Sequence, residues 1–310
     1  MMTLLQAAQA IGAQASGANV PFIGVSTDSR NVAQGDLFVA LKGERFDGHE
    51  YIRTAMSFGA VAAMVDHGWP DQDLGLPLLR VDSARLGLGR LAHAWRALNN
   101  TPLVAITGSN GKTTLKEMVA AILRAELWSS GVDDGADALL ATEGNLNNDI
   151  GVPLTLLELA PEHTAAVIEL GASRLGEIAY TVGMTKPHVA ILNNAGTAHV
   201  GEFGGPEKIV EAKGEIIEGL EADGIAVLNL DDKAFEIWKA RADGRKVLTF
   251  ALSNLSADFY ASDLDRDARG CPAFNLHTPD GVERVQLNLL GTHNVANALA
   301  AAAAAHALGV

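Results

Sequence analysis

The sequence has little cysteine, few aromatic residues and a shortage of basic side chains. Its one cysteine, Cys271, cannot form an internal disulfide or a cysteine-based zinc site, which favours a reducing compartment and an inert thiol. The 23 Lys and Arg residues against 37 Asp and Glu residues leave a net charge of −14. Such a chain repels a phosphate backbone, so we expect no general nucleic-acid binding, although a local nucleotide pocket is compatible with this charge.

Long apolar runs are also missing. No stretch approaches the length that spans a bilayer, and residues 1–14 lack the basic start of a signal peptide and predict a short amphipathic helix instead. We therefore expect no membrane insertion and a cytoplasmic location. What the chain does have is 48% hydrophobic residues over 310 positions, enough for about two packed domains.

The first of these is a small α/β domain, expected over residues 1–98. Short apolar runs predict its buried strands. The predicted elements are strands 37–41 and 61–65, a helix 51–58, a loop 70–77 and a helix through Leu91 and Trp95 that Ser83 caps. The turn cluster 99–102, Asn-Asn-Thr-Pro, marks the expected domain boundary.

Residues 99–310 predict a second α/β domain with a doubly wound, mostly parallel sheet. Four near-continuous aliphatic runs are typical of strands buried on both faces: 103–106, 165–168, 189–192 and 225–228. A ligand of such a sheet binds at the carboxyl ends of the strands. Around these runs, the acidic segment 129–141 predicts a surface loop, 257–290 a small antiparallel extension, and 294–308 an Ala-rich helix.

The sharpest functional signal is a glycine-rich segment between the run 103–106 and a predicted helix, 115–127. It reads Thr107-Gly108-Ser109-Asn110-Gly111-Lys112-Thr113-Thr114. Glycines let backbone N–H groups face an anion, the lysine supplies a cation for β- and γ-phosphates, and the threonine hydroxyl suits Mg²⁺. Because Ile106 stands where the usual P-loop has its first glycine, the motif is the shorter G-x-x-G-K-T; a chance glycine-rich turn is the alternative. We predict a P-loop ATPase domain.

Other polar residues fall at the expected carboxyl edge of the sheet. Glu169 follows the run 165–168 and can hold Mg²⁺ opposite Thr113, while His199 follows the run 189–192 and can ligate a second metal ion. A surface glutamate and a structural or exposed histidine are the alternatives. Lys213 lies in a helix-like run and is expected to be solvated, and Asn294 is expected to cap the last helix.

Several segments together resemble the Mur ligases, the ATP-dependent amide-bond-forming enzymes of bacterial peptidoglycan synthesis. They occur in the family's order along nearly the whole chain: Asp28-Ser29-Arg30, GDLFVALKGERFDGH (35–49), TGSNGKTT (107–114), TEGNLNNDIGVPLTLLEL (142–159), ELGASRLGEI (169–178), NNAGTAHVGEFGG (193–205), EAKGEI (211–216), NLDD (229–232) and GTHNVANALAA (291–301). GERFDGH and GNLNNDIGVPLTLL are most typical of members that join D-alanyl-D-alanine to UDP-N-acetylmuramoyl-tripeptide. Ligases that add the third peptide residue, folylpolyglutamate-type ligases and a non-catalytic nucleotide-binding module are the alternatives.

The resemblance implies a ligase reaction of the EC 6.3.2 type, with ATP and Mg²⁺, carried out by a monomer. ATP would phosphorylate the terminal carboxylate of the UDP-linked tripeptide, and the amine of D-alanyl-D-alanine would attack the acyl phosphate. The resemblance implies that the phosphates are held by Gly108, Ser109, Asn110, Gly111, Lys112, Thr113 and Thr114. It implies metal ions held by Thr113, Glu169 and His199, with a carbamylated Lys213 supporting the second ion, and adenine and ribose near His293 and Asn294. It also implies a uridine pocket lined by Ser29, Arg45 and Phe46, and a muramoyl peptide that faces Asn147 and Asn148.

The family normally has a third, Rossmann-like domain with a D-x-Y-N-A-N-P-like segment that contacts the nucleotide and the amine substrate. The given sequence ends at Val310, before such a segment. The resemblance therefore implies a two-domain piece, 1–98 for the UDP-substrate and 99–310 for ATP, with the C-terminal domain absent and with weak ligation or none. The acidic segment 129–141 looks like an insertion.

Overall fold

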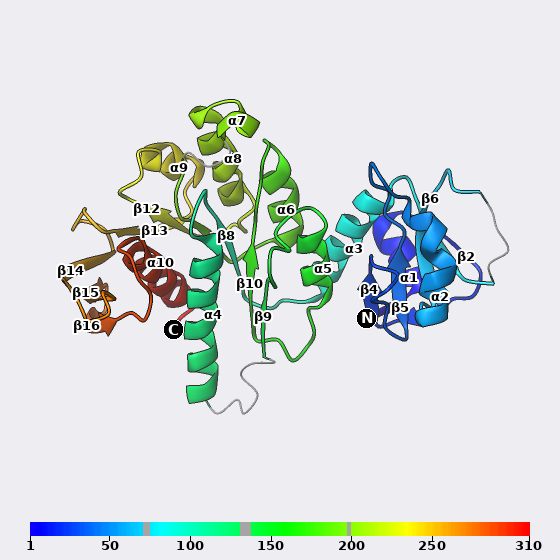
Figure 1. The fold of residues 1–310 in the computed structure, drawn as a ribbon, viewed down its shortest axis with the longest axis horizontal. Coiled ribbons are helices and arrows are strands. Elements are labelled where there is room, and N and C mark those ends of the chain that lie inside the picture. Colours follow the sequence, from blue (N-terminus) through cyan, green and yellow to red (C-terminus); the bar gives the residue numbers. More distant parts are fainter. Residues whose placement is uncertain (71–74, 131–137, 197–199) are drawn as a thin grey trace. The chain divides into compact units, whose positions relative to one another are not determined.

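The computed structural model describes residues 1–70, 75–130, 138–196 and 200–310, which form two compact units (Figure 1). The first unit comprises Met1–Asn100 and Pro153–Leu159, and the second comprises Thr101–Val152 and Ala160–Val310. Residues 71–74 of the loop expected at 70–77, residues 131–137 of the loop expected at 129–141, and His199 lie outside the described residues.

The first unit is built on a five-stranded sheet in the order β2-β7-β6-β5-β4, parallel except for the β2–β7 pair. The strands β1 and β3 form a separate two-stranded antiparallel sheet. The elements are β1 Met2–Thr3, α1 Leu4–Ile11, β2 Gln14–Ser16, β3 Pro21–Phe22, β4 Gly24–Ser26, β5 Asp36–Val39, η1 Gly48–Tyr51, α2 Ile52–Phe58, β6 Ala62–Asp66, β7 Leu78–Val81 and α3 Ala84–Leu98. The strands expected at 37–41 and 61–65 and the helix expected at 51–58 are thus confirmed to within two residues, which is ordinary for element ends, whereas the helix expected over 1–14 is the shorter α1.

Local chemistry explains where these elements begin. Ser83 caps α3 by accepting a hydrogen bond from the Leu86 N–H, as its sequence position predicts. Phe38 on β5 and Ala63 on β6 are fully buried beside Ile52 of α2, so alternate residues of both strands form one core with that helix. A cap and a shared core together fix the helices against the sheet.

The second unit is built on a nine-stranded sheet in the order β16-β15-β14-β13-β12-β11-β8-β10-β9. All pairs from β9 to β14 are parallel, and the pairs β14–β15 and β15–β16 are antiparallel. The elements are β8 Leu103–Thr107, α4 Lys112–Ser129, β9 Leu139–Ala141, α5 Gly151–Leu157, which continues into the first unit, β10 Ala165–Glu169, α6 Glu177–Thr185, β11 Val189–Leu192, α7 Val200–Phe203, α8 Pro206–Glu218, β12 Ile225–Asn229, α9 Phe235–Arg241, β13 Lys246–Ala251, β14 Phe259–Arg266, β15 Pro272–Thr278, β16 Gly281–Gln286 and α10 His293–Ala307.

The chain winds in both directions from β8, so helices cover both faces of the sheet. The long helix α4 packs beside α10, and both contribute to the core that contains Val104, Ile106 and Val295 (Figure 1). The helices α6 and α8 pack together and contact β8; right-handed crossovers in the opposite direction place them on the other face. The four aliphatic runs are strands as predicted, and the doubly wound fold is confirmed.

One expectation for this sheet is wrong. Residues 139–141, taken as part of a surface loop, form the buried edge strand β9, which pairs with Ala165–Val167. The acidic residues before it dominate the composition of the segment, but Leu139 and Leu140 are apolar and pack under α4. The edge strand matters because the segment that follows it in the sequence contacts Glu169.

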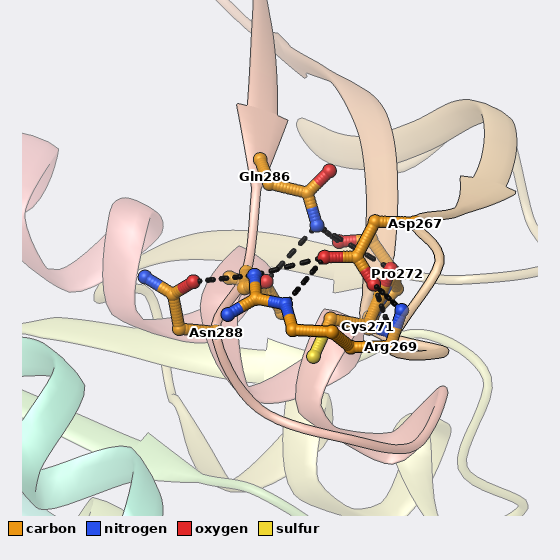
Figure 2. A network of polar contacts seen from close by, with 7 residues as sticks. Asp267, Arg269, Cys271, Pro272, Gln286 and Asn288 are labelled. Atoms are coloured by element: carbon orange, nitrogen blue, oxygen red, sulfur yellow. Dashed lines mark hydrogen bonds and ion pairs between the residues drawn. The ribbon is translucent and has the colours of Figure 1, made fainter.

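The antiparallel extension predicted at 257–290 is confirmed as β14, β15 and β16. Figure 2 shows the turn between β14 and β15, where the Asp267 carboxylate accepts hydrogen bonds from the Arg269 and Cys271 N–H groups, both at 2.9 Å. These bonds, with the Cys271 one the largest contribution, lower the pKa of Asp267. Gln286 on β16 donates to the carbonyl of buried Cys271, so the one thiol sits in a structural turn.

Candidate active site

The glycine-rich segment joins the end of β8 to the start of α4, as its sequence context predicts. Gly111 has a left-handed φ of 78°, and an added Cβ there would lie 3.0 Å from the Asn297 Oδ1 atom and 3.1 Å from the Asn193 Nδ2 atom. Glycine is therefore required both by conformation and by space. Below it, α4 starts at Lys112 without a side-chain cap, which leaves its first N–H groups for an anion.

Hydrogen bonds from asparagine side chains hold this loop in place. The Asn193 Nδ2 atom donates to the Asn110 carbonyl at 3.2 Å and to the Asn297 Oδ1 atom at 2.9 Å. Asn194 exchanges two hydrogen bonds with the Asn110 backbone. Asn193 and Asn297 are nearly fully buried, so these amides have no water to compete for them and fix the loop firmly.

Lys112 turns back over the loop that precedes it. Its Nζ atom donates to the Gly108 carbonyl at 3.0 Å, the position from which an ammonium group reaches phosphates lying on the loop. Burial lowers the pKa of Lys112, and the nearby Glu169 carboxylate opposes that shift. The lysine is thus a partly buried cation with a single acidic neighbour of note.

Glu169 lies at the end of β10 with 2% of its surface exposed. It is therefore not a surface glutamate, which was the alternative that the sequence left open. Its Oε2 atom accepts from the Thr113 hydroxyl at 2.9 Å, and its Oε1 atom accepts from the Asn147 amide at 2.7 Å. A hydroxyl and one carboxylate are oxygen ligands of the kind Mg²⁺ takes when it keeps several waters. Among the described residues no group of three or more His, Cys, Asp or Glu side chains could hold a metal ion.

Lys213 departs from expectation. It was expected to be solvated, but it is only 3% exposed, because it lies among the buried residues of α8. Burial and then the charge of Lys112 lower its pKa to about 8, against the opposing effects of Glu177 and Glu215. Its Nζ atom also lies 5.5 Å from the centre of the Phe203 ring.

One cavity of about 400 Å³ brings these residues together at the carboxyl edge of the sheet. Residues from four separate parts of the sequence line it, among them Ser109, Lys112, Asn147, Asn148 and Lys213. All five were predicted site residues, and they share one space only after folding.

The two predicted adenine-side residues lie in the first turn of α10. His293 is exposed, whereas Asn294 is buried and receives a hydrogen bond from Asn297 at 3.0 Å. Asn294 does not cap the helix as expected: α10 already begins at His293 after Thr292, and the Asn294 amide donates to the Leu290 carbonyl. The helix start is therefore tied through Asn297 to the phosphate loop.

A second cavity, of about 570 Å³, lies within the first unit. Its lining includes buried Ser29 and exposed Phe46, two of the three residues expected at a uridine pocket, whereas exposed Arg45 is not part of it. Tyr51, which the sequence did not single out, also lines it. Asp28 and Arg30 also line it and form an ion pair of 2.7 Å, and the hydrogen bonds from Arg30 lower the pKa of Asp28 to about 2.

Comparison with known proteins decides the family. Residues 106–305 match the Mur ligase middle domain, and residues 21–96 match the domain described as Mur ligase family, catalytic domain. The chain belongs to the Mur ligase family. The resemblance drawn from TGSNGKTT and its companion segments is thereby confirmed.

Individual Mur ligases are similar over nearly all of this chain. The UDP-N-acetylmuramoyl-tripeptide–D-alanyl-D-alanine ligase of Escherichia coli is 44% identical over 99% of the chain and 65% of its own length. MurF from Acinetobacter baumannii superposes with a TM-score of 0.90 at 39% identity, covering 100% of this chain and 65% of that one. MurF from Thermotoga maritima, solved with ADP, gives a TM-score of 0.79 at 31% identity, covering 92% and 63%. The chain thus spans about 65% of the length of such relatives.

Two features of this Mur ligase site were not found from the sequence. Asn297 was passed over because an asparagine inside an Ala-rich helix carries no signal until the helix is seen to pack on the loop. Asn147 was expected to face a peptide substrate; it lines the cavity and also bonds Glu169, a contact between residues 22 positions apart. Both are revealed by packing between elements and not by motif spacing.

Proposed function

We propose that this chain carries the substrate- and ATP-binding parts of a ligase that joins D-alanyl-D-alanine to UDP-N-acetylmuramoyl-tripeptide. The observation that carries the proposal is the cavity of the second unit, which holds the amines of Lys112 and Lys213 above an uncapped helix start. The Lys112 cation and the free N–H groups suit a reaction between two anions, a nucleoside triphosphate and a carboxylate. The similarity to D-alanyl-D-alanine ligases over nearly the whole chain supports this choice of substrates.

The proposed reaction has two steps. An oxygen of the peptide carboxylate bonds to the γ-phosphorus of ATP while the bond to ADP breaks. The amine nitrogen of D-alanyl-D-alanine then bonds to the acyl carbon, loses a proton, and phosphate leaves with the electron pair of the broken C–O bond. Neither step needs a protein nucleophile, so Lys112 and the α4 N–H groups act by offsetting charge on the phosphoryl oxygens.

Thr113 and Glu169 would hold Mg²⁺, which supplies further positive charge beside the phosphates. We propose a carbamate on Lys213: its neutral amine nitrogen bonds to the carbon of CO₂ and releases a proton, which turns a cation into an anion able to support a second metal ion. The lowered pKa supports this, since roughly one-tenth of such amines are neutral at pH 7. His199 is proposed as a ligand of that ion, and it lies outside the described residues.

The first unit supplies the proposed UDP site. Residues 1–98 would form the UDP-substrate-binding domain, with Ser29, Phe46 and Tyr51 around the uridine, and residues 99–310 the ATP-binding domain. No helix within the described ranges is both long and apolar enough to cross a membrane. A cytoplasmic location, a monomeric state and nucleotide rather than nucleic-acid binding complete the proposal.

A substrate panel tests it. UDP-muramoyl peptides and amines would be assayed with this chain, alone and supplemented with the C-terminal part of the Escherichia coli relative. We expect ligation of D-alanyl-D-alanine to the tripeptide in the supplemented mixture. Preference for a single amino acid added to a dipeptide would assign the chain to another type of Mur ligase, and nucleotide binding without ligation of any amine would favour the non-catalytic nucleotide-binding module.

A further inference from the structure

A second lysine of α4 is buried beneath the phosphate site and has no part in the proposed reaction. Lys116 lies one helical turn after Lys112 and is 2% exposed. Its Nζ atom donates to the Thr142 carbonyl at 2.5 Å, and its other recorded partner is the largely exposed Glu117, at 2.8 Å. A buried amine costs more free energy than an apolar side chain of similar length, so its presence calls for a specific role.

Its partner Thr142 stands where β9 leaves the sheet. The Thr142 N–H still donates to the Val167 carbonyl, in register with the pairing of Ala141 and Val167. In a parallel ladder of this register the next rung would run from the Glu169 N–H to the Thr142 carbonyl. Here the Lys116 Nζ atom takes that carbonyl, and the Glu169 N–H donates instead to the Thr142 hydroxyl at 2.9 Å.

The exchange of partners ends the β9–β10 pairing at Glu169, the residue whose carboxylate is proposed to hold Mg²⁺. Beyond Thr142 the chain enters the loop with Asn147, whose amide holds Glu169 Oε1 and whose carbonyl accepts from the Gly171 N–H. The carboxylate of Glu169 is therefore fixed from two sides, by the backbone bond to Thr142 and by the side chain of Asn147. Both contacts depend on the residue at which the β9–β10 pairing ends.

We propose that Lys116 is a positioning residue: by capturing the Thr142 carbonyl it terminates strand β9 and thereby sets Glu169 and the Asn147 loop for metal-dependent nucleotide binding. This rests on the proposed function of Thr113 and Glu169 as magnesium ligands. Without the Lys116 amine, the Thr142 carbonyl is free to accept from the Glu169 N–H, and the hydroxyl and the loop lose their present places.

The test compares Lys116→Met, Lys116→Arg and Glu117→Gln with the parent chain. Mn²⁺ serves as the probe, titrated by electron paramagnetic resonance in the presence of ADP, and ADP affinity is measured separately in EDTA. We expect Lys116→Met to weaken Mn²⁺ binding about tenfold, the size typical for residues that support metal ligands, with little change in EDTA. Lys116→Arg should recover much of the loss, and Glu117→Gln should match the parent.

A further variant keeps the test sharp if Lys116→Met folds poorly. Thr142→Val removes the hydroxyl while keeping the shape, and its effect should not add to that of Lys116→Met because both act on one link. Equal Mn²⁺ affinity in Lys116→Met and the parent, or an equal loss with and without metal, would overturn the positioning role while leaving the proposed function in place. If the parent chain binds no Mn²⁺ with ADP, the proposed function itself fails, and the role of Lys116 with it.

Discussion

Two amines, Lys112 and Lys213, line the cavity of the second unit together with the carboxylates of Asp149 and Glu177, in a molecule with a net charge of −14. Burial lowers the pKa of both, so each amine has a larger neutral fraction than a surface lysine. Their environments differ in a useful way. The Glu169 carboxylate opposes the pKa shift of Lys112, whereas the charge of Lys112 adds to the pKa shift of Lys213, against the opposing carboxylates of Glu177 and Glu215.

Replacing Lys112 tests the phosphate loop. We expect Lys112→Ala to weaken ATP–Mg²⁺ binding by at least about tenfold, because a charge-assisted contact to phosphate contributes roughly 1.5–3 kcal/mol. Isothermal titration calorimetry measures the affinity. Lys208→Ala, at an exposed position of α8, is the matched control and should bind like the parent. Equal affinity in Lys112→Ala and the parent would contradict the P-loop assignment.

The pH dependence of carbamate formation tests Lys213. Only the neutral amine bonds to CO₂, so at fixed dissolved CO₂ a group of pKa about 8 should take up more as pH rises from 7 to 9. The expected observation is a ¹³C carbamate signal that grows over this range and is absent in Lys213→Ala. A signal unaffected by Lys213→Ala would return this residue to a structural role.

In a longer form of the protein that ligates, Lys213→Ala should lose activity. Short carboxylic acids such as formate or acetate should restore part of it, since they can occupy the place of the lost carbamate. The readout is the ligation rate with and without added acid. A fully active Lys213→Ala protein would show that no carboxylate is needed there.

At the level of elements, the phosphate loop lies between the end of β8 and the start of α4, and hydrogen bonds from asparagine side chains hold it in place. Gly111→Ala should weaken nucleotide binding and lower the melting temperature, since it adds left-handed strain of about 1–2 kcal/mol and crowds Asn297. Gly244→Ala is the matched control, with φ of 83° and nothing within 4 Å of an added Cβ. Gly244→Ala therefore adds the left-handed strain without the crowding. If both variants bind ADP equally well, crowding against the asparagines is unimportant.

In the first unit, the segment around η1 depends on His49. Its buried ring contacts the Asp47 carboxylate through Nδ1, accepts from the Asp66 N–H at 3.1 Å and stacks on Trp69. His49→Ala should lower the free energy of unfolding by about 2–4 kcal/mol, because it removes a buried ring from its half-buried partners, and should weaken UDP binding at the cavity that Gly48 and Tyr51 line. Thermal unfolding and a UDP titration measure these effects. A stable variant with unchanged UDP affinity would separate the ring from that cavity.

On the scale of the whole molecule, two cavities in two units predict two separable binding activities. Lys112→Ala should leave UDP-peptide affinity unchanged, because the residues that line the first-unit cavity are all its own. These 310 residues by themselves should ligate D-alanyl-D-alanine barely or not at all, since they span about 65% of the relatives and positioning the amine contributes several kcal/mol to the barrier. Turnover compared with the Escherichia coli relative measures this, and comparable rates would show that the remaining third is dispensable.

The sequence by itself determined the family, the alternation of strands and helices and the phosphate loop, because these depend on short-range patterns: aliphatic runs, and Gly111 and Lys112 between a strand and a helix. It also identified Glu169, since a polar residue directly after a buried strand falls at the sheet edge. Only the tertiary structure decided the rest. Burial of Lys213, the strand at 139–141, the Asn193–Asn297 bond and the hold of Lys116 on Thr142 all join residues distant in the chain. Local pattern carries no trace of such contacts, since each exists only once helices have packed on the sheet.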